Sequence, residues 1–445
     1  MFRSCSTWRI FLIFDSLENF WVIFTVIDDL FLLCIMLSLY FHIPFCAQQC
    51  KYCSFSVLSW ATETMIHDYL NRFHQEIDTY GKIFAGQEIK SLYFWWWTPN
   101  LIWEKEIISL IEHCEQMFNF ENFWELSIEC NPYPTEEVLH FVNVLQKRYK
   151  KRPRVRFSFW LQSFDNEVLV NTGRNCSFPG MVDFLRNLQP LKQDNSVYNF
   201  DFIAFGKFHT SKKGNIQLRN QSALDFFYDF VNSGFADSFS LYTLELFEHQ
   251  QWKKNNEVDK QYFGSDDDIF EEFSFLKDIL EEAGYSRYEI SNFSKVAKSS
   301  LHNRVYREME DYLGLWVSAS SFISSQNPAY EQLCEHLEKR WESWIRFTNS
   351  PYYPKYLEDD FCVIKEKIPL SKKDFLIEKF FLGLRTDQGI KQIGEYQDVL
   401  VTDWQDKIQC YENQGLLVEK NGTLILTDQG MNVYNSVVTN LLAEV

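Results

Sequence analysis

The sequence predicts an α/β fold, in which a partial (β/α)6 barrel precedes a C-terminal helical domain of winged-helix type. Short runs of aromatic and β-branched residues recur along the first part of the chain, and longer stretches with helical spacing separate them. After about Ser324 the pattern changes to helices with a charged face. Because strands that alternate with helices form parallel βα units, six such runs suit an open barrel with its chemistry at the carboxyl ends of the strands.

The expected strands are short apolar runs bounded by polar loops. Between them, apolar residues return every three or four positions, as at Ile107, Leu110, Ile111 and Cys114, which is the spacing of an amphipathic helix. The six runs are residues 37–43, 91–96, 125–130, 155–162, 199–205 and 239–244.

Residues 1–35 form a very apolar extension of doubtful status. Acidic residues interrupt it between Asp15 and Asp29, so no uncharged stretch long enough to span a bilayer precedes the barrel. No small-residue cleavage site of a signal peptide follows its basic residues. Since Met36 stands immediately before the first strand, we expect that this extension is not part of the working protein.

Three further parts are expected along the chain: a barrel over residues 36–325, a helical connector over 326–368 and the winged-helix-like domain over 369–445. The last part contains "GLLVEKNGTLILTDQG", in which two short strands turn at Asn421-Gly422 before a helix. Because no basic recognition helix accompanies it, we expect this domain to pack rather than to bind DNA.

Charge and cysteine content narrow the range of expected partners and cell compartments. With 43 basic and 61 acidic residues, the formal net charge is -18, which disfavours nucleic acid as a partner. Eleven cysteines without even spacing do not form a secreted disulfide framework, so we expect a reducing compartment, by default the cytoplasm. Glycine is scarce, at 16 of 445 residues, while tryptophan numbers 14.

Three cysteines lie close together directly after the first expected strand. Cys46, Cys50 and Cys53 follow the pattern C-x3-C-x2-C in "YFHIPFCAQQCKYCSF". Three thiolates on one loop can converge on a metal centre, and no fourth ligand is evident nearby, which leaves the open position that reactive chemistry requires. The alternative is a structural zinc site with His42 as the fourth ligand, although structural zinc ligands usually come in two separated pairs.

This stretch resembles radical SAM proteins, in the branch that contains oxygen-independent coproporphyrinogen III oxidases and the HemW heme chaperones. The resemblance runs from about Leu39 to the C-terminus and includes "SIECNP", "FSFWLQSFD", "TGRN" and "NFDFI". It implies a radical SAM barrel in which Cys46, Cys50 and Cys53 hold a [4Fe-4S] cluster. S-adenosylmethionine then chelates the fourth iron. The residues that the resemblance assigns to this cofactor are Tyr40, Tyr52, Trp97, Thr98, Glu129, Gln162, Arg174 and Asp201.

Three features favour the heme chaperones over the oxidases. The oxidase branch usually carries a further cysteine where this chain has Phe55. A stretch near residue 302 is similar to the heme-binding motif His-Asn-x-x-Tyr-Trp, which implies heme contacts by His302, Asn303 and Tyr306, with Arg307 in place of the tryptophan. "LGLRTDQGI" near the C-terminus also resembles the HemW tail.

The resemblance therefore implies a protein that binds a [4Fe-4S] cluster, S-adenosylmethionine and heme, and transfers heme to acceptor proteins. Membrane association is expected only as a transient contact through an acceptor. No catalytic residue is assigned, and coproporphyrinogen oxidase activity is not expected. The alternatives are such an oxidase in porphyrin metabolism, or a degenerate, inactive copy.

Several positions depart from the family pattern in the same way. The family has glycine at positions that in this sequence are Trp95, Trp96, Trp97, Trp160, Phe205, Phe208 and Trp316. Glycine at strand ends lets backbone approach a ligand and adopt positive φ, whereas an indole adds bulk there. Because neighbouring strand residues alternate faces, at least one indole of the triplet from Trp95 to Trp97 should face the ligand side or solvent, and we expect weak binding of S-adenosylmethionine.

Overall fold

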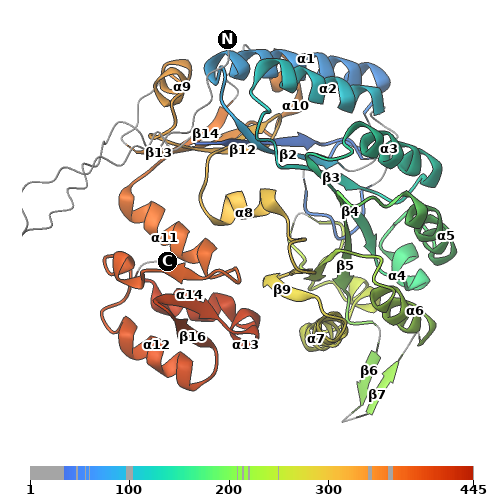
Figure 1. Ribbon diagram of the computed structural model, residues 1–445. Helices are drawn as coiled ribbons and strands as arrows, with labels where there is room; N and C mark the ends of the chain where they lie inside the picture. The colour runs from blue at the N-terminus through green and yellow to red at the C-terminus, as the bar shows by residue number, and fades with distance from the viewer. Residues whose placement is uncertain are drawn as a thin grey trace, which may run out of the picture. The chain divides into compact units, whose positions relative to one another are not determined.

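The computed structural model in Figure 1 describes most of the chain after Cys34. The described ranges are 35–46, 49–55, 57–59, 61–96, 104–207, 209–212, 215–218, 221–248, 250–338, 343–358 and 364–443. The expected extension therefore lies almost wholly outside the described residues, as do Trp97 and Thr98. No helix among the described residues is long and apolar enough to cross a membrane.

Six parallel strands form the centre of the main sheet, and they confirm the predicted α/β fold class. Each pairs with the next in parallel, so their carboxyl ends lie along one edge. They lie within three residues of the predicted runs because each has a buried apolar face, while the other face also carries buried polar residues such as Ser127 and Asn199. In order they are β1 (Leu37–Ile43), β2 (Ile89–Trp96), β3 (Glu125–Cys130), β4 (Arg154–Gln162), β5 (Ser196–Ala204) and β8 (Ser238–Thr243).

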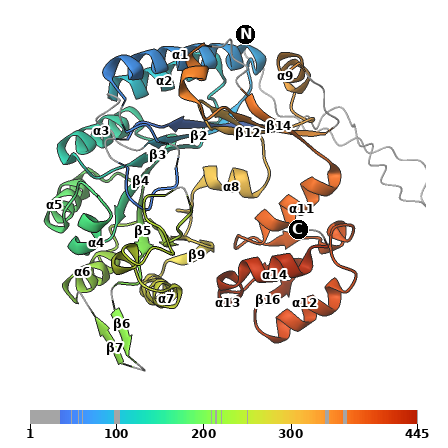
Figure 2. The same ribbon diagram turned by 180° about the vertical axis from the view of Figure 1, so that it is seen from behind.

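Helices follow these strands and cover the outer face of the curved sheet, as Figures 1 and 2 show. Local signals set several of their ends: the Thr62 side chain caps α1, and Ser265 forms a capping box with Asp268 at α7. The helices are α1 (Glu63–Ile83), α2 (Glu104–Met117), α3 (Thr135–Arg148), α4 (Asn166–Asn171), α5 (Phe178–Leu188), α6 (Gln221–Asn232) and α7 (Asp266–Glu282).

The sheet continues beyond the six central strands at both edges. At one edge β10 (Asn292–Ser294) and β9 (Ser286–Glu289) add antiparallel to β8. At the other edge β11 (Tyr312–Leu315) pairs parallel with β1. Helix α8 (Leu301–Arg307) connects the two edges. A separate hairpin pairs β6 (His209–Lys212) with β7 (Asn215–Leu218).

The prediction of a helical connector over residues 326–368 is wrong in part. Helices α9 (Tyr330–His336) and α10 (Tyr353–Glu358) lie in this range. Between and after them, β13 (Trp344–Asn349) and β14 (Ile364–Leu370) extend the main sheet through β12 (Ser320–Ser324). In β13 buried and partly exposed residues alternate, which is the period of a strand and not that of a helix with a charged face.

The C-terminal residues form a helical domain with its own apolar core and a three-stranded sheet. Asn421 and Gly422 have φ of 53° and 74°, the pair of positive values that a two-residue hairpin turn requires, so the predicted hairpin is present. The elements are α11 (Lys372–Gly383), β15 (Ile390–Lys391), α12 (Trp404–Asn413), β16 (Leu417–Lys420), β17 (Thr423–Leu426), α13 (Asp428–Asn432) and α14 (Tyr434–Leu441).

Trp316, directly after β11, has an unusual backbone for its residue type. Its φ is 96°, in the region that glycine adopts freely and bulky residues avoid. Its side chain is nevertheless fully buried, where it stacks on Tyr69 with ring centroids 3.6 Å apart and lies against Phe73 at 4.2 Å. The core therefore holds an indole at a position with the backbone of a glycine.

Candidate functional site

A cavity of about 440 Å³ opens at the carboxyl ends of the central strands. This is the edge where βα loops converge, so the site lies where the fold class predicts chemistry. The cavity is lined by the loop that carries Cys46, Cys50 and Cys53, which we call the cluster loop. Residues near the ends of β3, β4, β5 and β8 and one residue of the C-terminal domain also line it. Its polar and sulfur-bearing lining residues include Cys46, Cys50, Cys53, Tyr52, Glu129, Gln162, Arg174, Asp201, Tyr242, Glu245 and Arg385.

The three predicted cysteines all line this cavity. Cys46 and Cys53 are buried, and Cys50 is half-buried. Backbone hydrogen bonds hold their loop: the Cys46 amide donates to Leu58 O at 3.3 Å and the Cys53 amide donates to Cys50 O at 3.0 Å. The loop therefore presents three thiols to one enclosed volume, as a cluster site requires.

Three thiols on one loop are the ligand type that a [4Fe-4S] cluster requires. Within the described part of the chain, no group of three or more His, Cys, Asp or Glu side chains is spaced to hold one metal ion. In a [4Fe-4S] cluster each thiolate binds a different iron, so the sulfurs stand farther apart. Burial raises the pKa of Cys53 to about 12, which favours the neutral thiol; a bond to iron would offset that cost.

His42 does not join the cysteines as a fourth ligand. Its side chain lines a neighbouring hollow rather than the cysteine cavity. There its Nδ1 lies 3.1 Å from the Tyr40 hydroxyl, and its ring lies 4.6 Å from that of Trp95. This arrangement does not support the structural zinc alternative.

Glu129, which is half-buried, and Asp201, which is buried, form an acidic wall of the cavity. The Tyr93 hydroxyl donates a hydrogen bond to Glu129, and Asp201 accepts hydrogen bonds from Asn199 at 2.7 Å and Ser158 at 3.0 Å. Burial, together with the nearby Asp201, raises the pKa of Glu129 to about 8, and burial also raises the pKa of Asp201. A cationic ligand would be stabilised here, because it would relieve the repulsion between the two carboxylates.

Gln162 and Arg174 carry buried polar atoms that lack a hydrogen-bond partner among the described residues. These atoms are Gln162 Oε1 and Arg174 Nε. Arg174 also donates to the Trp160 carbonyl and, at 3.4 Å, to Asn131 Oδ1. Gln162 has a φ of 69° at the end of β4, a strained conformation of the kind found at functional sites. Buried unpaired polar atoms are costly unless a ligand satisfies them, so both residues fit the role predicted for them.

The two predicted tyrosines lie on different sides of the cluster loop. Tyr52 lines the main cavity, close to Cys50 and Arg174, and its ring meets Phe205 edge-on at 5.8 Å. Tyr40 instead lines the neighbouring hollow beside His42. Only Tyr52 therefore shares a cavity with the thiols.

Trp95 and Trp160 stand where the family has glycine, and both line the cysteine cavity. Trp160 is buried against Cys46 and Cys53, and Trp95 packs against the same group. The Trp95 ring also meets Phe55 edge-on at 4.4 Å. An indole of the triplet therefore enters the ligand side, as the strand alternation predicts, and it occupies volume beside the thiols.

Of the three residues predicted to bind heme, two line a hollow and one is fully buried. Asn303 and Tyr306 line the neighbouring hollow, about 510 Å³ in volume, together with Tyr40, His42 and Trp95. His302 is fully buried, with Nδ1 2.7 Å from Ser91 Oγ and Nε2 2.7 Å from the Tyr306 hydroxyl. Burial lowers its pKa to about 3. His302 would bind a heme iron only if one of these two contacts broke, because a ring nitrogen must be released to act as a ligand.

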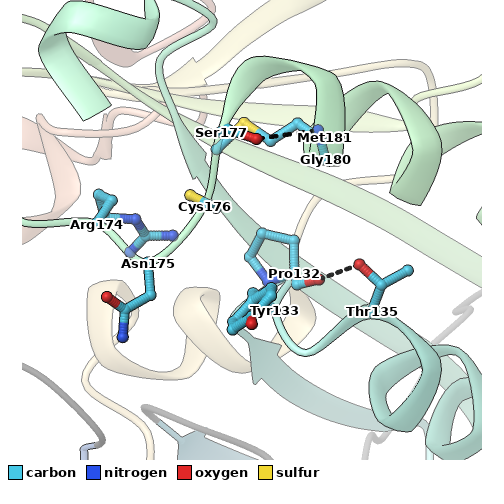
Figure 3. Close-up of a pocket in the computed structure, with 9 residues that line it drawn as sticks. All are labelled: Pro132, Tyr133, Thr135, Arg174, Asn175, Cys176, Ser177, Gly180 and Met181. Atoms are coloured by element: carbon cyan, nitrogen blue, oxygen red, sulfur yellow. Dashed lines mark hydrogen bonds between the residues drawn. The ribbon is translucent and has the colours of Figure 1, made fainter. Parts of the chain in front are cut away.

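Sequence reasoning missed two residues near the cavity. Figure 3 shows a second pocket, of about 360 Å³, in which Cys176 lies beside Arg174. The Cys176 thiol hydrogen-bonds Arg174, and burial raises its pKa. In "TGRNCS" the resemblance singles out only the arginine. The second missed residue is Arg385, whose position depends on how the C-terminal domain packs, and no local pattern indicates that.

Comparisons with known proteins match two parts of the chain to family models. The model of the radical SAM superfamily matches residues 40–212, and that of the HemN C-terminal domain matches residues 370–433. The first range contains the three cysteines and every predicted residue of the S-adenosylmethionine site. The chain therefore contains a radical SAM domain followed by a domain of the HemN C-terminal type.

Within the superfamily, its curated relatives are chiefly heme chaperones. It is 24% identical to the heme chaperone HemW of Lactococcus lactis, over 92% of this chain and 97% of the relative. Identity to the HemW of Escherichia coli is 25%, over 92% and 98%. A mitochondrial radical S-adenosyl methionine domain-containing protein 1 of Danio rerio is 24% identical over 79% and 73%.

A solved structure confirms the radical SAM fold. Coproporphyrinogen III oxidase (HemN) of Escherichia coli superposes with a TM-score of 0.67 at 18% sequence identity, covering 91% of this chain and 89% of that one. The likeness extends through the barrel and the C-terminal domain. At this identity it shows the fold and not the activity.

Proposed function

We propose that this radical SAM protein is a heme chaperone, which binds a [4Fe-4S] cluster, S-adenosylmethionine and heme, and transfers heme to acceptor proteins in the cytoplasm. One observation carries the proposal. Three thiols face a cavity that also contains an acidic pair and two polar side chains with unpaired buried atoms. HemW relatives that match nearly the whole chain support the heme-carrying role.

The chain's residues have complementary roles in this proposal. When bound, a cluster with S-adenosylmethionine supplies one-electron chemistry. Cys46, Cys50 and Cys53 would hold three irons. Glu129 and Asp201 would bind the cationic groups of S-adenosylmethionine, and the Arg174 guanidinium would bind its carboxylate. The cluster, the cofactor and their residues fit the cavity in chemistry, while the indole of Trp95 reduces the space for the cofactor.

The second candidate, a coproporphyrinogen III oxidase, is favoured by the shared fold alone. At the cavity rim this chain has Phe55, half exposed, where the oxidases resembled in sequence usually carry a cysteine. A phenyl ring offers apolar contact and no metal ligand. The residue at the rim therefore favours a protein that binds a tetrapyrrole over an enzyme that oxidises one.

Heme transfer tests the proposal. Protein loaded with cluster and heme under anaerobic conditions is mixed with apomyoglobin, and the growth of the myoglobin spectrum is followed against free heme at the same concentration. We expect transfer from the loaded protein, and no vinyl product when coproporphyrinogen III, S-adenosylmethionine and a reductant are supplied. Absence of heme binding, or formation of the vinyl product, would overturn the chaperone assignment.

A further inference from the structure

The C-terminal domain contributes one of the residues that line the main cavity. Arg385 follows the end of α11, within the stretch "LGLRTDQGI", and lines the cavity together with Tyr242, Phe247 and Ser291 of the barrel. A β-bridge between Glu289 and Thr386, the next residue, holds this stretch against β9. Arg385 therefore reaches the cavity from a fixed point of contact between the domain and the barrel.

Arg385 differs from the other arginines around this contact in having no carboxylate partner. Arg287 pairs with Asp428 at 2.8 Å, Arg304 with Asp387 at 3.4 Å, and Arg307 with Glu289. These three guanidinium groups have protein carboxylates beside them. The structure forms no such pair with Arg385 among the described residues.

The contacts that Arg385 does make orient it without neutralising it. Its guanidinium lies 5.0 Å from the centre of the Tyr434 ring, and its Nε is buried without a hydrogen-bond partner in the described part of the protein. The Arg385 side chain also hydrogen-bonds that of Tyr434, a neutral partner that orients the guanidinium and leaves its other N–H groups for an anion. An arginine arranged in this way is suited to bind a carboxylate in two parallel hydrogen bonds.

Apolar residues line part of the cavity to which Arg385 contributes. Phe55 and Phe247 are 50% and 49% exposed, and Ile203 and Leu244 line the wall beneath. Large exposed rings beside a cavity are typical of binding sites for flat apolar molecules. The combination of these apolar residues with an arginine that lacks a carboxylate partner fits a planar ligand that carries an acidic group on its edge.

We propose that Arg385 anchors a propionate carboxylate of the bound heme, while the rim of Phe55 and Phe247 contacts its apolar face. This inference rests on the proposed function, in which heme is the cargo. It makes the C-terminal domain part of the heme site, so that cargo binding depends on the contact between that domain and the barrel.

Paired titrations with heme and heme dimethyl ester test the proposal, because esterification removes the propionate charges and keeps the macrocycle. Both ligands are titrated into the full-length wild type, Arg385→Ala and Arg385→Lys, with binding followed by the visible spectrum. Arg186→Ala serves as the control, since Arg186 is an exposed residue of α5 that pairs with Asp183. Thermal unfolding of each variant shows whether it folds.

We expect Arg385→Ala to weaken heme binding about tenfold, which is about 1.4 kcal/mol, and to leave ester binding unchanged. Arg385→Lys should lose less, and Arg186→Ala should lose nothing. Equal weakening of both ligands, or no weakening of either, would overturn the anchoring role while heme carriage stands. If the wild type binds neither ligand, the proposed function itself fails and this inference with it.

Discussion

The cluster loop and helix α8 both carry motifs that resemble ligand sites, yet they are built in opposite ways. Around the loop, three thiols, two unpaired polar atoms and an acidic pair face a cavity. On α8, His302 is fully buried and both ring nitrogens already contact hydroxyl groups. Around the cluster loop, polar atoms and thiols remain available to a ligand. On α8, contacts within the protein already occupy both ring nitrogens of His302.

A sequence motif therefore identifies the region of a ligand site more surely than it identifies the atom that contacts the ligand. In α8, Asn303 and Tyr306 line a hollow. His302 does not line it, but its Nε2 lies 2.7 Å from the Tyr306 hydroxyl and so orients that side chain. Buried polar atoms are almost always paired, so Gln162 Oε1 and Arg174 Nε, which lack a partner among the described residues and belong to residues that line the cavity, are candidate ligand contacts. The predictions below test this contrast, starting with the largest expected effect.

Loss of a cluster thiol should abolish the metal centre. Cys50→Ala should remove the brown colour and almost all bound iron from anaerobically reconstituted protein, because three thiolates are the minimum for this cluster. The matched control is Cys410→Ala, which alters an exposed cysteine of the C-terminal domain. If Cys50→Ala retained as much iron as the control, the cluster would be held elsewhere.

Loss of His302 should weaken the fold rather than heme binding. His302→Ala removes a buried ring and leaves Ser91 and Tyr306 without their partner, at a cost of about 2 to 4 kcal/mol in the free energy of unfolding. Urea unfolding measures this cost. A folded His302→Ala variant whose heme spectrum has changed would instead make His302 an iron ligand, and the contrast between the two regions would fail.

Removal of the indole beside the thiols should improve cofactor binding. Trp95→Gly should raise the affinity of cluster-loaded protein for S-adenosylmethionine at least tenfold, about 1.4 kcal/mol, because the side chain occupies the cavity. Trp124→Gly is the control, since Trp124 is exposed just before β3. Calorimetry that shows micromolar affinity before the change, or no gain after it, would mean that the cavity tolerates the indole.

The two regions should also respond to pH in opposite directions. Glu129 has a raised pKa of about 8 against 4.5 in the unfolded chain, so the folded state binds more protons and its stability falls as pH rises through that window. His302 has a lowered pKa of about 3 against 6.5, so its contribution is lost as pH falls through that window.

Urea unfolding at pH 5 and pH 8 measures the Glu129 effect. The loss of stability between these pH values should be smaller in Glu129→Gln than in the wild type. Glu76, whose pKa burial raises to about 7, acts in the same direction in both proteins and does not disturb the comparison. If stability fell equally in Glu129→Gln and in the wild type, Glu129 would not have a raised pKa in the folded protein.

The barrel strands and the cluster loop could be predicted from the sequence because the signals are local. Six apolar runs coincide with β1 to β5 and β8, and the polar residues at their ends meet at one edge, as parallel topology requires. The strands follow from the amino-acid pattern, whereas the assignment of Glu129, Gln162 and Asp201 to the site follows from the resemblance.

The remaining features depend on packing between distant segments. Strand β13 is difficult to distinguish from a helix in the sequence because its partner strands lie outside the window in which periodicity is read. Arg385 is separated from the barrel residues of its cavity by almost a hundred residues or more. The burial of His302 arises from Ser91 on a different strand. Such contacts leave no local pattern in the chain.

Iron and sulfide analysis tests the central claim most directly, namely that the cavity of Cys46, Cys50 and Cys53 holds a [4Fe-4S] cluster with one open iron. The wild-type chain is reconstituted anaerobically, metal and sulfide are counted per chain, and the reduced protein is studied by electron paramagnetic resonance with and without S-adenosylmethionine in excess. The account predicts about four irons and four sulfides, and a signal that changes when S-adenosylmethionine is added. A colourless protein that binds zinc tightly in place of iron would contradict it.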